Sequence, residues 1–143
     1  MEKNNLDIRL APIYQPIWQK KRIKIFFGGR GAGRTHSIAR YILVRAMQEN
    51  LRIWCARETQ KSIAQSVHHV FVELITLYGL NSHFNITKDD ITCLETGSFF
   101  MFKGFRGDGG QYSAEGLKAY EDFDILWIEE AAACSMESLN VVS

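Results

Sequence analysis

The sequence has few cysteines and prolines and no long hydrophobic run. Its three cysteines, Cys55, Cys93 and Cys134, are far apart and form no CxxC pair. This spacing argues against a zinc site and favours buried, reduced thiols. No stretch approaches the roughly 18 apolar residues that a membrane helix needs, and the N-terminus lacks a signal-peptide pattern. We therefore expect a cytoplasmic protein with no membrane contact.

Neither sign of charge dominates the chain. Seventeen Lys and Arg stand against 16 Asp and Glu, which gives a net charge of +1. This balance excludes a domain that holds nucleic acid by bulk charge alone, although local basic patches remain possible. Hydrophobic residues make up 46% of the chain, so the dominant state is globular rather than disordered. The length of 143 residues fits one domain.

Strand-like and helix-like patterns alternate along the chain. Pro12 and Pro16, the only two prolines, mark residues 1–22 as an irregular lead-in. Apolar runs predict buried strands at 23–27, 51–56 and 123–128, periodic segments predict helices from Thr35 and over 63–77, and 84–102 is expected to form a three-stranded meander. A further helix could begin at Met136. The alternation predicts an α/β fold with a mostly parallel sheet flanked by helices.

The glycine-rich segment GGRGAGRT, residues 28–35, is the strongest chemical signal. It lies between a predicted strand and a predicted helix and has the spacing of a phosphate-binding loop, except that Arg34 stands where lysine belongs. Small residues let backbone N–H groups surround phosphate oxygens, and the following helix adds partial positive charge. The hydroxyl of Thr35 is suited to Mg²⁺. The candidate phosphate-binding residues are Gly28, Gly29, Arg30, Gly31, Ala32, Gly33, Arg34 and Thr35.

Two other interpretations of this loop are weaker. A glycine-rich turn that binds nothing would not require four glycines followed by a base and a hydroxyl. A dinucleotide-binding loop needs Gly-x-Gly-x-x-Gly, and this sequence has one residue too few between Gly31 and Gly33.

The apolar run ILWI at 125–128 ends in Glu129 and Glu130, about 95 residues after the loop. Two carboxylates at the end of a buried strand cost desolvation free energy unless a cation meets them. In nucleoside-triphosphate hydrolases that cation is Mg²⁺, and a second acid can deprotonate the attacking water. Alone, this pattern is weak evidence, because it more often marks a strand followed by a solvated helix start. Together with the loop, it predicts a nucleotide site.

Three blocks of sequence carry a resemblance. They are FFGGRGAGRTHS at 26–37, ARETQKSIAQSV at 56–67 and FDILWIEEA at 123–131. In this order they resemble the N-terminal ATPase part of the large terminase subunit of tailed bacteriophages, over about residues 8–140. The resemblance implies a P-loop ATPase of the additional-strand, catalytic-glutamate class that packages double-stranded viral DNA into a procapsid. It also implies a portal protein, a small terminase subunit and a homo-oligomeric ring as partners.

The resemblance also implies roles for individual residues. The loop 28–35 would hold the phosphates of ATP, and Thr35 and Glu129 would ligand Mg²⁺. Glu130 would be the catalytic acid, and Arg30 would face the γ-phosphate in cis or be reoriented during the cycle. Arg57 follows the second strand, where the family often places functional basic residues; a surface or helix-capping arginine is the alternative. The lead-in Tyr14-Gln15-Pro16 could contact adenine, although a plain surface loop fits that segment better.

The sequence departs from the family pattern in two respects. Arg34 replaces the loop lysine, and no clustered acidic set for nuclease chemistry follows the second acid. We therefore expect residues 23–143 to be a partial P-loop ATPase core, incomplete at its C-terminus and without a nuclease domain. A degenerate or truncated prophage remnant that binds nucleotide without efficient turnover is the alternative. A cellular P-loop ATPase unrelated to packaging is a third possibility, against which the block at 56–67 argues.

Overall fold

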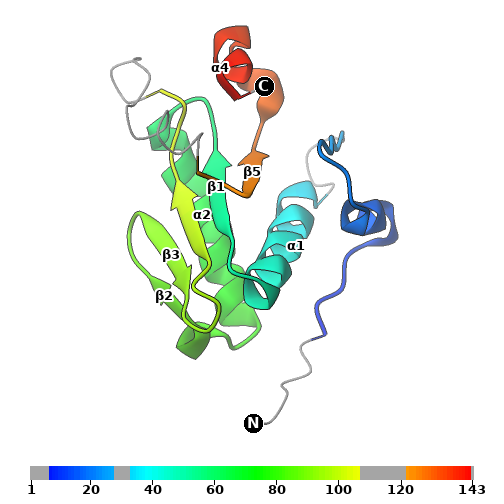
Figure 1. Cartoon of the computed structure of the whole chain (residues 1–143), viewed down its shortest axis with the longest axis vertical. Coiled ribbons are helices and arrows are strands. Elements are labelled where there is room, and N and C mark those ends of the chain that lie inside the picture. The colour runs from blue at the N-terminus through cyan, green and yellow to red at the C-terminus, as the bar shows by residue number, and fades with distance from the viewer. Residues whose placement is uncertain (1–6, 28–32, 107–121, 143) are drawn as a thin grey trace.

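The computed structural model of the protein describes residues 7–27, 33–106 and 122–142. Its helices are α1 (Arg34–Gln48), α2 (Gln60–Leu77) and α4 (Met136–Val142), with 3₁₀ helices η1 (Pro12–Trp18), η2 (Asn81–His83) and η3 (Ala131–Ala133). Its strands are β1 (Arg52–Ala56), β2 (Phe84–Ile86), β3 (Asp90–Cys93), β4 (Phe99–Phe102) and β5 (Ile125–Ile128). The α/β class predicted from the sequence is confirmed (Figure 1).

The described strands form one sheet in the order β2-β3-β4-β1-β5. Strand β1 pairs in parallel with both β4 and β5, while β2, β3 and β4 form an antiparallel meander. The predicted meander is confirmed, but the expectation of a mostly parallel sheet is wrong. Short turns join β2, β3 and β4, and such turns can connect only antiparallel neighbours.

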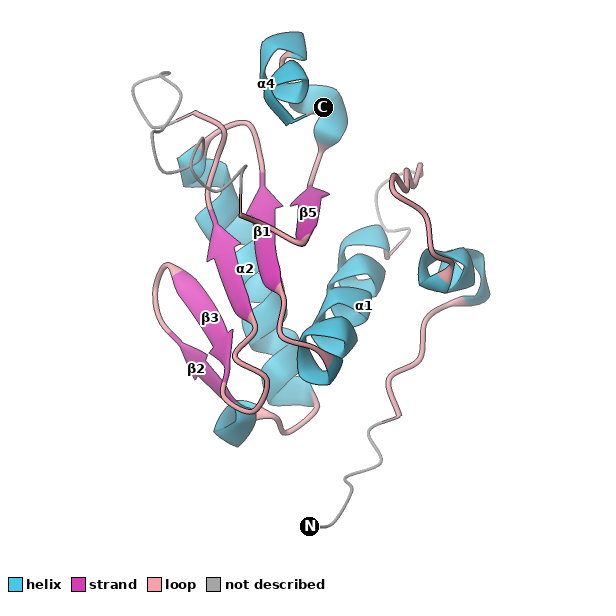
Figure 2. Cartoon of the chain, viewed as in Figure 1, coloured by secondary structure: helices cyan, strands magenta, loops and turns pink. Residues whose placement is uncertain are grey.

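Helix α2 lies across one face of the sheet, and α1 packs beside it (Figure 2). Strand β1 is buried on both faces, since its side chains alternate between two hydrophobic clusters. Ile53 and Cys55 belong to the main core beneath the helices. Trp54 packs on the opposite face with Phe105 and Phe123. This double burial explains why the strand is continuously apolar from Ile53 to Ala56 rather than alternating.

A Schellman motif ends α2 where the sequence predicts its end. The N–H of Leu80 donates to the carbonyl of Ile75 at 2.8 Å, and the N–H of Gly79 donates to that of Thr76 at 3.1 Å. Gly79 has a φ of 65°, a conformation that glycine adopts without steric cost.

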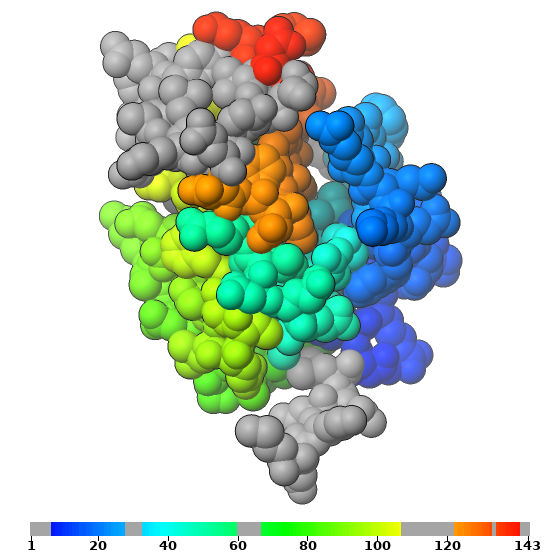
Figure 3. Space-filling view, viewed as in Figure 1, coloured from blue at the N-terminus to red at the C-terminus, as the bar shows by residue number. Residues whose placement is uncertain are grey.

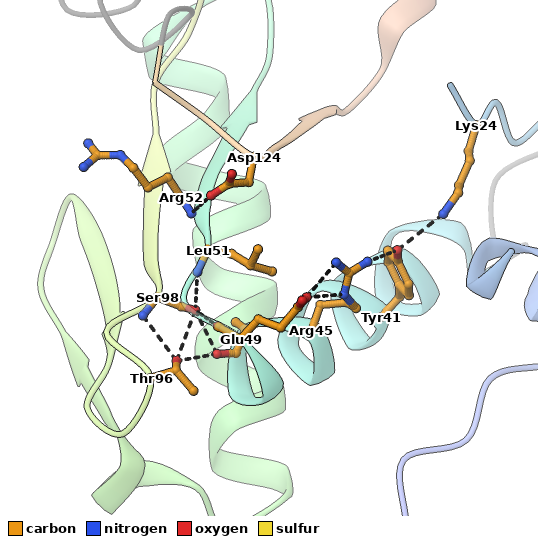
Figure 4. Close-up of polar contacts among 10 residues, drawn as sticks. Lys24, Tyr41, Arg45, Glu49, Leu51, Arg52, Thr96, Ser98 and Asp124 are labelled. Carbon is orange, nitrogen blue, oxygen red and sulfur yellow. Dashed lines mark hydrogen bonds and ion pairs between the residues drawn. The ribbon is translucent and has the colours of Figure 1, made fainter. Parts of the chain in front are cut away.

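The hydroxyl of Ser98 joins the end of α1 to the start of β1 (Figure 4). Ser98 is fully buried, and its Oγ lies 2.8 Å from the carbonyl oxygen of Ala46 and 2.5 Å from that of Glu49. The N–H of Leu51 donates to the same oxygen at 2.9 Å. One side chain therefore serves three backbone groups at the turn that brings β1 into the sheet.

The predicted buried strand at 23–27 is wrong. The structure assigns no strand there, and the side chains of Ile23, Ile25 and Phe27 are 73%, 69% and 87% exposed. The segment lies against η1 and α1 instead. Lys24 reaches the carbonyl of Ile17 and the hydroxyl of Tyr41. A strand requires a neighbour for its backbone groups, and an apolar sequence alone does not provide one.

The N-terminal lead-in, which the sequence predicts to be irregular, contains the 3₁₀ helix η1 and packs against the core. The segment forms one side of the molecule (blue in Figure 3), and η1 buries Tyr14 and Ile17. The ring of Tyr14 contacts that of Phe26.

The cysteines are free. Cys55 and Cys93 are buried as predicted, whereas Cys134 is only partly buried. No helix in the part of the chain that the structure describes is both long and apolar enough to cross a membrane.

Candidate functional site

The candidate site lies where β1 and β5 end. These strands are parallel neighbours, so their carboxyl ends reach the same edge of the sheet. Arg57 directly follows β1, and Glu129 and Glu130 directly follow β5. The N–H of Glu129 donates to the carbonyl of Ala56 at 2.9 Å, which continues the pairing of the two strands up to the site.

The first turn of α1 faces the same edge. Gly33 precedes the helix with a φ of 72°, and its carbonyl accepts the N–H of Ser37 at 3.0 Å. An added Cβ at Gly33 would meet nothing within 4 Å, so the positive φ rather than space favours glycine. Thr35 is the second residue of α1, and its hydroxyl donates to Oε1 of Glu129 at 2.7 Å.

Arg57 bridges the two acids. Its Nε donates to Oε2 of Glu129 at 3.1 Å, and its Nη2 lies 2.8 Å from Oε1 of Glu130. The side chains of Arg57 and Glu129 are each 16% exposed, whereas that of Glu130 is 61% exposed. Adjacent carboxylates in a partly desolvated site repel each other, and one guanidinium compensates both. The side chain of Arg57 is thus held between the two acids.

The backbone of Glu130 has an unusual conformation. Among the described non-glycine residues, only Glu130 has a positive φ, at 56° with a ψ of 49°. For a residue with a Cβ this conformation costs about 1–2 kcal/mol. Residues held in such conformations cluster at active sites and ligand clamps.

The structure brings together four of the predicted site residues: Thr35, Arg57, Glu129 and Glu130. Gly33 and Arg34 lie at the start of α1. The remaining loop residues, Gly28, Gly29, Arg30, Gly31 and Ala32, lie outside the described residues.

The oxygen ligands at this edge fit Mg²⁺. Mg²⁺ prefers hard oxygen ligands, keeps several waters and binds one or two protein groups together with phosphates. The adjacent Thr35 hydroxyl and Glu129 carboxylate provide such a pair. Among the described residues, no group of three or more His, Cys, Asp or Glu could hold a metal by itself.

A second ion-pair cluster lies next to the site and was missed from the sequence. Oε1 of Glu58 accepts a hydrogen bond from Nε of Arg106 at 3.1 Å, and Nη2 of Arg106 lies 2.9 Å from Oε2 of Glu137. Burial raises the pKa of Glu58, but hydrogen bonds from Ser138, Ser135 and Arg106 outweigh it and lower the pKa overall. A charged pair directly after a buried strand, Arg57 and Glu58, is the signal that could have indicated this cluster.

The sequence profile of the phage terminase large subunit family matches residues 20–143, most of the chain. The chain belongs to this family. The chain is also similar to the terminase large subunit of Bacillus phage SPP1, with 25% identity over 146 aligned residues. That alignment covers 96% of this chain and 34% of the SPP1 protein. The chain therefore spans about a third of the length of this terminase relative.

Proposed function

We propose that this chain is the ATPase part of a phage large terminase subunit, which couples ATP hydrolysis to packaging of viral double-stranded DNA. One observation carries the proposal. Thr35, at the end of the glycine-rich loop, donates a hydrogen bond to Glu129, the first acid after β5. The two sequence motifs therefore meet in space. Membership of the terminase family supports the same function.

The proposal assigns the fold to the P-loop NTPases of the additional-strand, catalytic-glutamate class. In this assignment the backbone of residues 28–33 and the N-terminus of α1 bind the phosphates of ATP. Arg34 and Arg30 supply positive charge to the same phosphates. Thr35 and Glu129 hold Mg²⁺, which when bound would neutralise charge on the transferred phosphoryl group.

Glu130 is the proposed general base. Its side chain is the more exposed of the two acids, so it is the one that water can reach. A carboxylate that accepts a proton from the attacking water typically accelerates a reaction about 10²–10⁴-fold. Arg57 contacts both acids and orients Glu130. In this arrangement one residue binds the metal and its neighbour performs proton transfer.

The proposed partners are those of a packaging motor. They are double-stranded viral DNA, the portal protein, the small terminase subunit and further copies of the chain in a ring.

Titration calorimetry with a non-hydrolysable ATP analogue tests the nucleotide site. We expect Mg²⁺-dependent binding that Thr35→Ala weakens at least tenfold, because the variant lacks the hydroxyl ligand. Thr76→Ala, at an exposed position on α2, is the matched control and should bind as the parent does. Absence of binding by the parent chain, or equal Mg²⁺ dependence in Thr35→Ala, would overturn the assignment.

A second candidate function is nucleotide binding without efficient turnover. The observation that favours it is Arg34, which stands at the first position of α1 in place of the usual loop lysine. A steady-state ATPase assay on the purified chain separates the two. Turnover above the buffer rate that Glu130→Gln removes supports the enzyme, and binding without turnover supports the second candidate.

A further inference from the structure

The segment that follows Glu130 contacts two residues that lie just beyond the ends of other strands, Glu58 and Arg106. The N–H of Ser135 donates to Oε2 of Glu58 at 3.3 Å. Two residues later, the carboxylate of Glu137 pairs with Arg106 at 2.9 Å. Glu58 and Arg106 are also paired with each other, at 3.1 Å. The four residues form one connected polar cluster, which we call the Glu58 cluster.

The Glu58 cluster spans three parallel elements of the sheet. Glu58 lies two residues after β1, and Arg106 lies four residues after β4. The N–H of Arg106 donates to the carbonyl of Glu58 at 2.9 Å, and Thr59 forms a parallel bridge with Arg106. The backbones that carry the two charges are therefore fixed relative to each other. Ser135 and Glu137 belong to the chain after β5, where the described pairing with the backbone of β1 reaches Glu129, whose N–H donates to the carbonyl of Ala56.

The side chains of Glu58 and Arg106 are shielded where they meet, whereas that of Glu137 is 69% exposed. Those of Glu58 and Arg106 are 22% and 23% exposed, comparable to Arg57 and Glu129 in the neighbouring site. Ser138, at the start of α4, is fully buried, and the N–H of Ser138 donates to Oγ of Ser135 at 3.1 Å. Charged pairs that are shielded from water hold their geometry better than exposed surface pairs.

In the described part of the chain, the Glu130 carboxylate pairs with Arg57, and its carbonyl oxygen lies 4.0 Å from Sγ of Cys134. The φ of 56° at Glu130 is held against a steric cost, and the carboxylate is exposed. Only four residues separate Glu130 from Ser135, so a fixed Ser135 restricts the backbone between them. A displacement of about 1 Å in a catalytic group can lower a rate about a hundredfold.

We propose that Glu58 is a positioning residue for Glu130 and that it acts together with Arg106 by holding the segment 131–137. This inference rests on the proposed ATPase function, since it assigns Glu58 no contact with nucleotide. Arg57 and Glu58, adjacent in sequence, then have separate tasks. Arg57 binds the two acids directly, and Glu58 fixes the chain that follows them.

The kinetic experiment compares Glu58→Gln, Arg106→Gln and the double variant with the parent chain. We expect each single variant to lower kcat about tenfold or more while the KM for Mg-ATP changes less than about twofold, because the loop and Thr35 are untouched. The kcat of the double variant should be no lower than that of the more impaired single variant, because the effects of groups that act as a unit do not add. Glu49→Gln removes an exposed ion pair on α1 and should keep the parent kcat.

Hydrogen exchange supplies a readout that does not depend on turnover. In both single variants we expect amides of 129–142 to exchange at least tenfold faster, while amides of β3 and α2 keep their parent protection. Unchanged exchange over 129–142 would overturn the anchor. Faster exchange with a parent kcat would overturn the positioning role. A parent chain without ATPase activity would defeat the proposed function and the positioning role together, and the exchange result would still judge the anchor by itself.

Discussion

Thr35 and Glu129 are 94 residues apart in sequence and share a 2.7 Å hydrogen bond at the end of β5. The bond joins the first turn of α1 to the strand that ends in the two acids. It places a neutral oxygen and a carboxylate oxygen side by side, the combination that suits a divalent cation bound to phosphate. The geometry makes the two motifs parts of one site and not two independent features of the sequence.

Glu129→Gln should raise the Mg²⁺ concentration that nucleotide binding requires. The amide keeps the shape of the side chain and removes the negative charge that a cation requires. Titration of Mg²⁺ at constant nucleotide analogue should show a midpoint at least tenfold higher than in the parent. Glu95→Gln, at an exposed position in the turn after β3, is the control and should leave the midpoint unchanged. An unchanged midpoint in Glu129→Gln would remove this residue from the metal site.

Glu130→Gln should abolish hydrolysis and leave binding largely intact. The amide cannot accept a proton from water, so we expect kcat to fall about 10²–10⁴-fold. A coupled assay of phosphate release measures the rate, and calorimetry with the non-hydrolysable analogue measures binding. Hydrolysis by Glu130→Gln at the parent rate would show that another group activates the water.

Most elements of the fold can be predicted because their signals are local. The end of α2 follows from Gly79, whose positive φ permits the Schellman motif. The meander follows from its short turns. The segment 23–27 is the counterexample: its residues favour a strand, but Ile23, Ile25 and Phe27 remain exposed, and none of the described strands pairs with the segment. Strand formation depends on a partner that the local sequence does not specify.

The site was predictable to the extent that its chemistry lies in contiguous motifs. Thr35, Glu129 and Glu130 stand out because a loop and an apolar strand lead into them. The pairing of Arg57 with both acids was not predictable from spacing, since the β1–β5 pairing creates it. Glu58 and Arg106 are further removed, because their contact depends on the ends of β1 and β4 lying side by side.

Ser98→Ala should destabilise the fold. Ser98 is fully buried and serves the carbonyls of Ala46 and Glu49 and the N–H of Leu51. Removal of a buried partner costs about 1–3 kcal/mol. Urea denaturation should show a lower midpoint with an unchanged slope. Ser82→Ala, at an exposed position in η2, should have the parent midpoint. Equal midpoints for Ser98→Ala and the parent would show that Thr96 or water replaces the hydroxyl.

The pKa of Cys134 predicts slow alkylation at moderate pH. Burial, and after it the nearby Glu58 carboxylate, raise this pKa to about 11. The thiolate is the nucleophile, so at pH 8 its fraction should be at least about a hundredfold smaller than for an ordinary thiol with a pKa near 8.5. The rate should rise about tenfold per pH unit between pH 8 and 10, because only the thiolate fraction changes. Cys55 and Cys93 are buried, so labelling of the native chain reports Cys134.

Mass spectrometry after timed iodoacetamide treatment measures this rate, and the same chain unfolded in urea is the control. Glu58→Gln should increase the native rate at pH 8, because the variant removes a negative charge next to the thiol. Native labelling at pH 8 as fast as in the unfolded chain would contradict the raised pKa.

The free energy of unfolding should decrease as the pH is lowered, and part of this decrease should depend on Glu58. The pKa of Glu58 is lowered in the folded state from the ordinary value of 4.5. The unfolded state therefore binds more protons in this range, so the contribution of Glu58 is present above about pH 4.5 and is lost as the pH falls through the folded-state pKa. Thermal melts should show a Tm difference between parent and Glu58→Gln at pH 6–7 that shrinks towards pH 3. A constant difference would show that packing, not charge, gives Glu58 its effect.

Arg34 differs chemically from the lysine that usually ends a phosphate-binding loop. Lysine is a compact charge on a flexible stem, whereas arginine has a wide planar fork that needs more space. Arg34 begins α1 directly before Thr35, so its side chain starts beside the proposed metal ligand. Its charge should still attract polyphosphate. We expect nucleotide binding to persist while the alignment of the γ-phosphate with Glu130 is impaired.

Arg34→Lys should therefore increase turnover and leave the affinity for nucleotide within a few-fold of the parent. Misalignment by about 1 Å can cost on the order of a hundredfold in rate, so a gain of tenfold or more is expected where the rest of the site is competent. Arg40→Lys, in the same helix and bonded to Tyr78, is the matched control and should keep the parent rate. Robust hydrolysis by the parent that Arg34→Lys leaves unchanged or lowers would show that arginine performs the task of the lysine here.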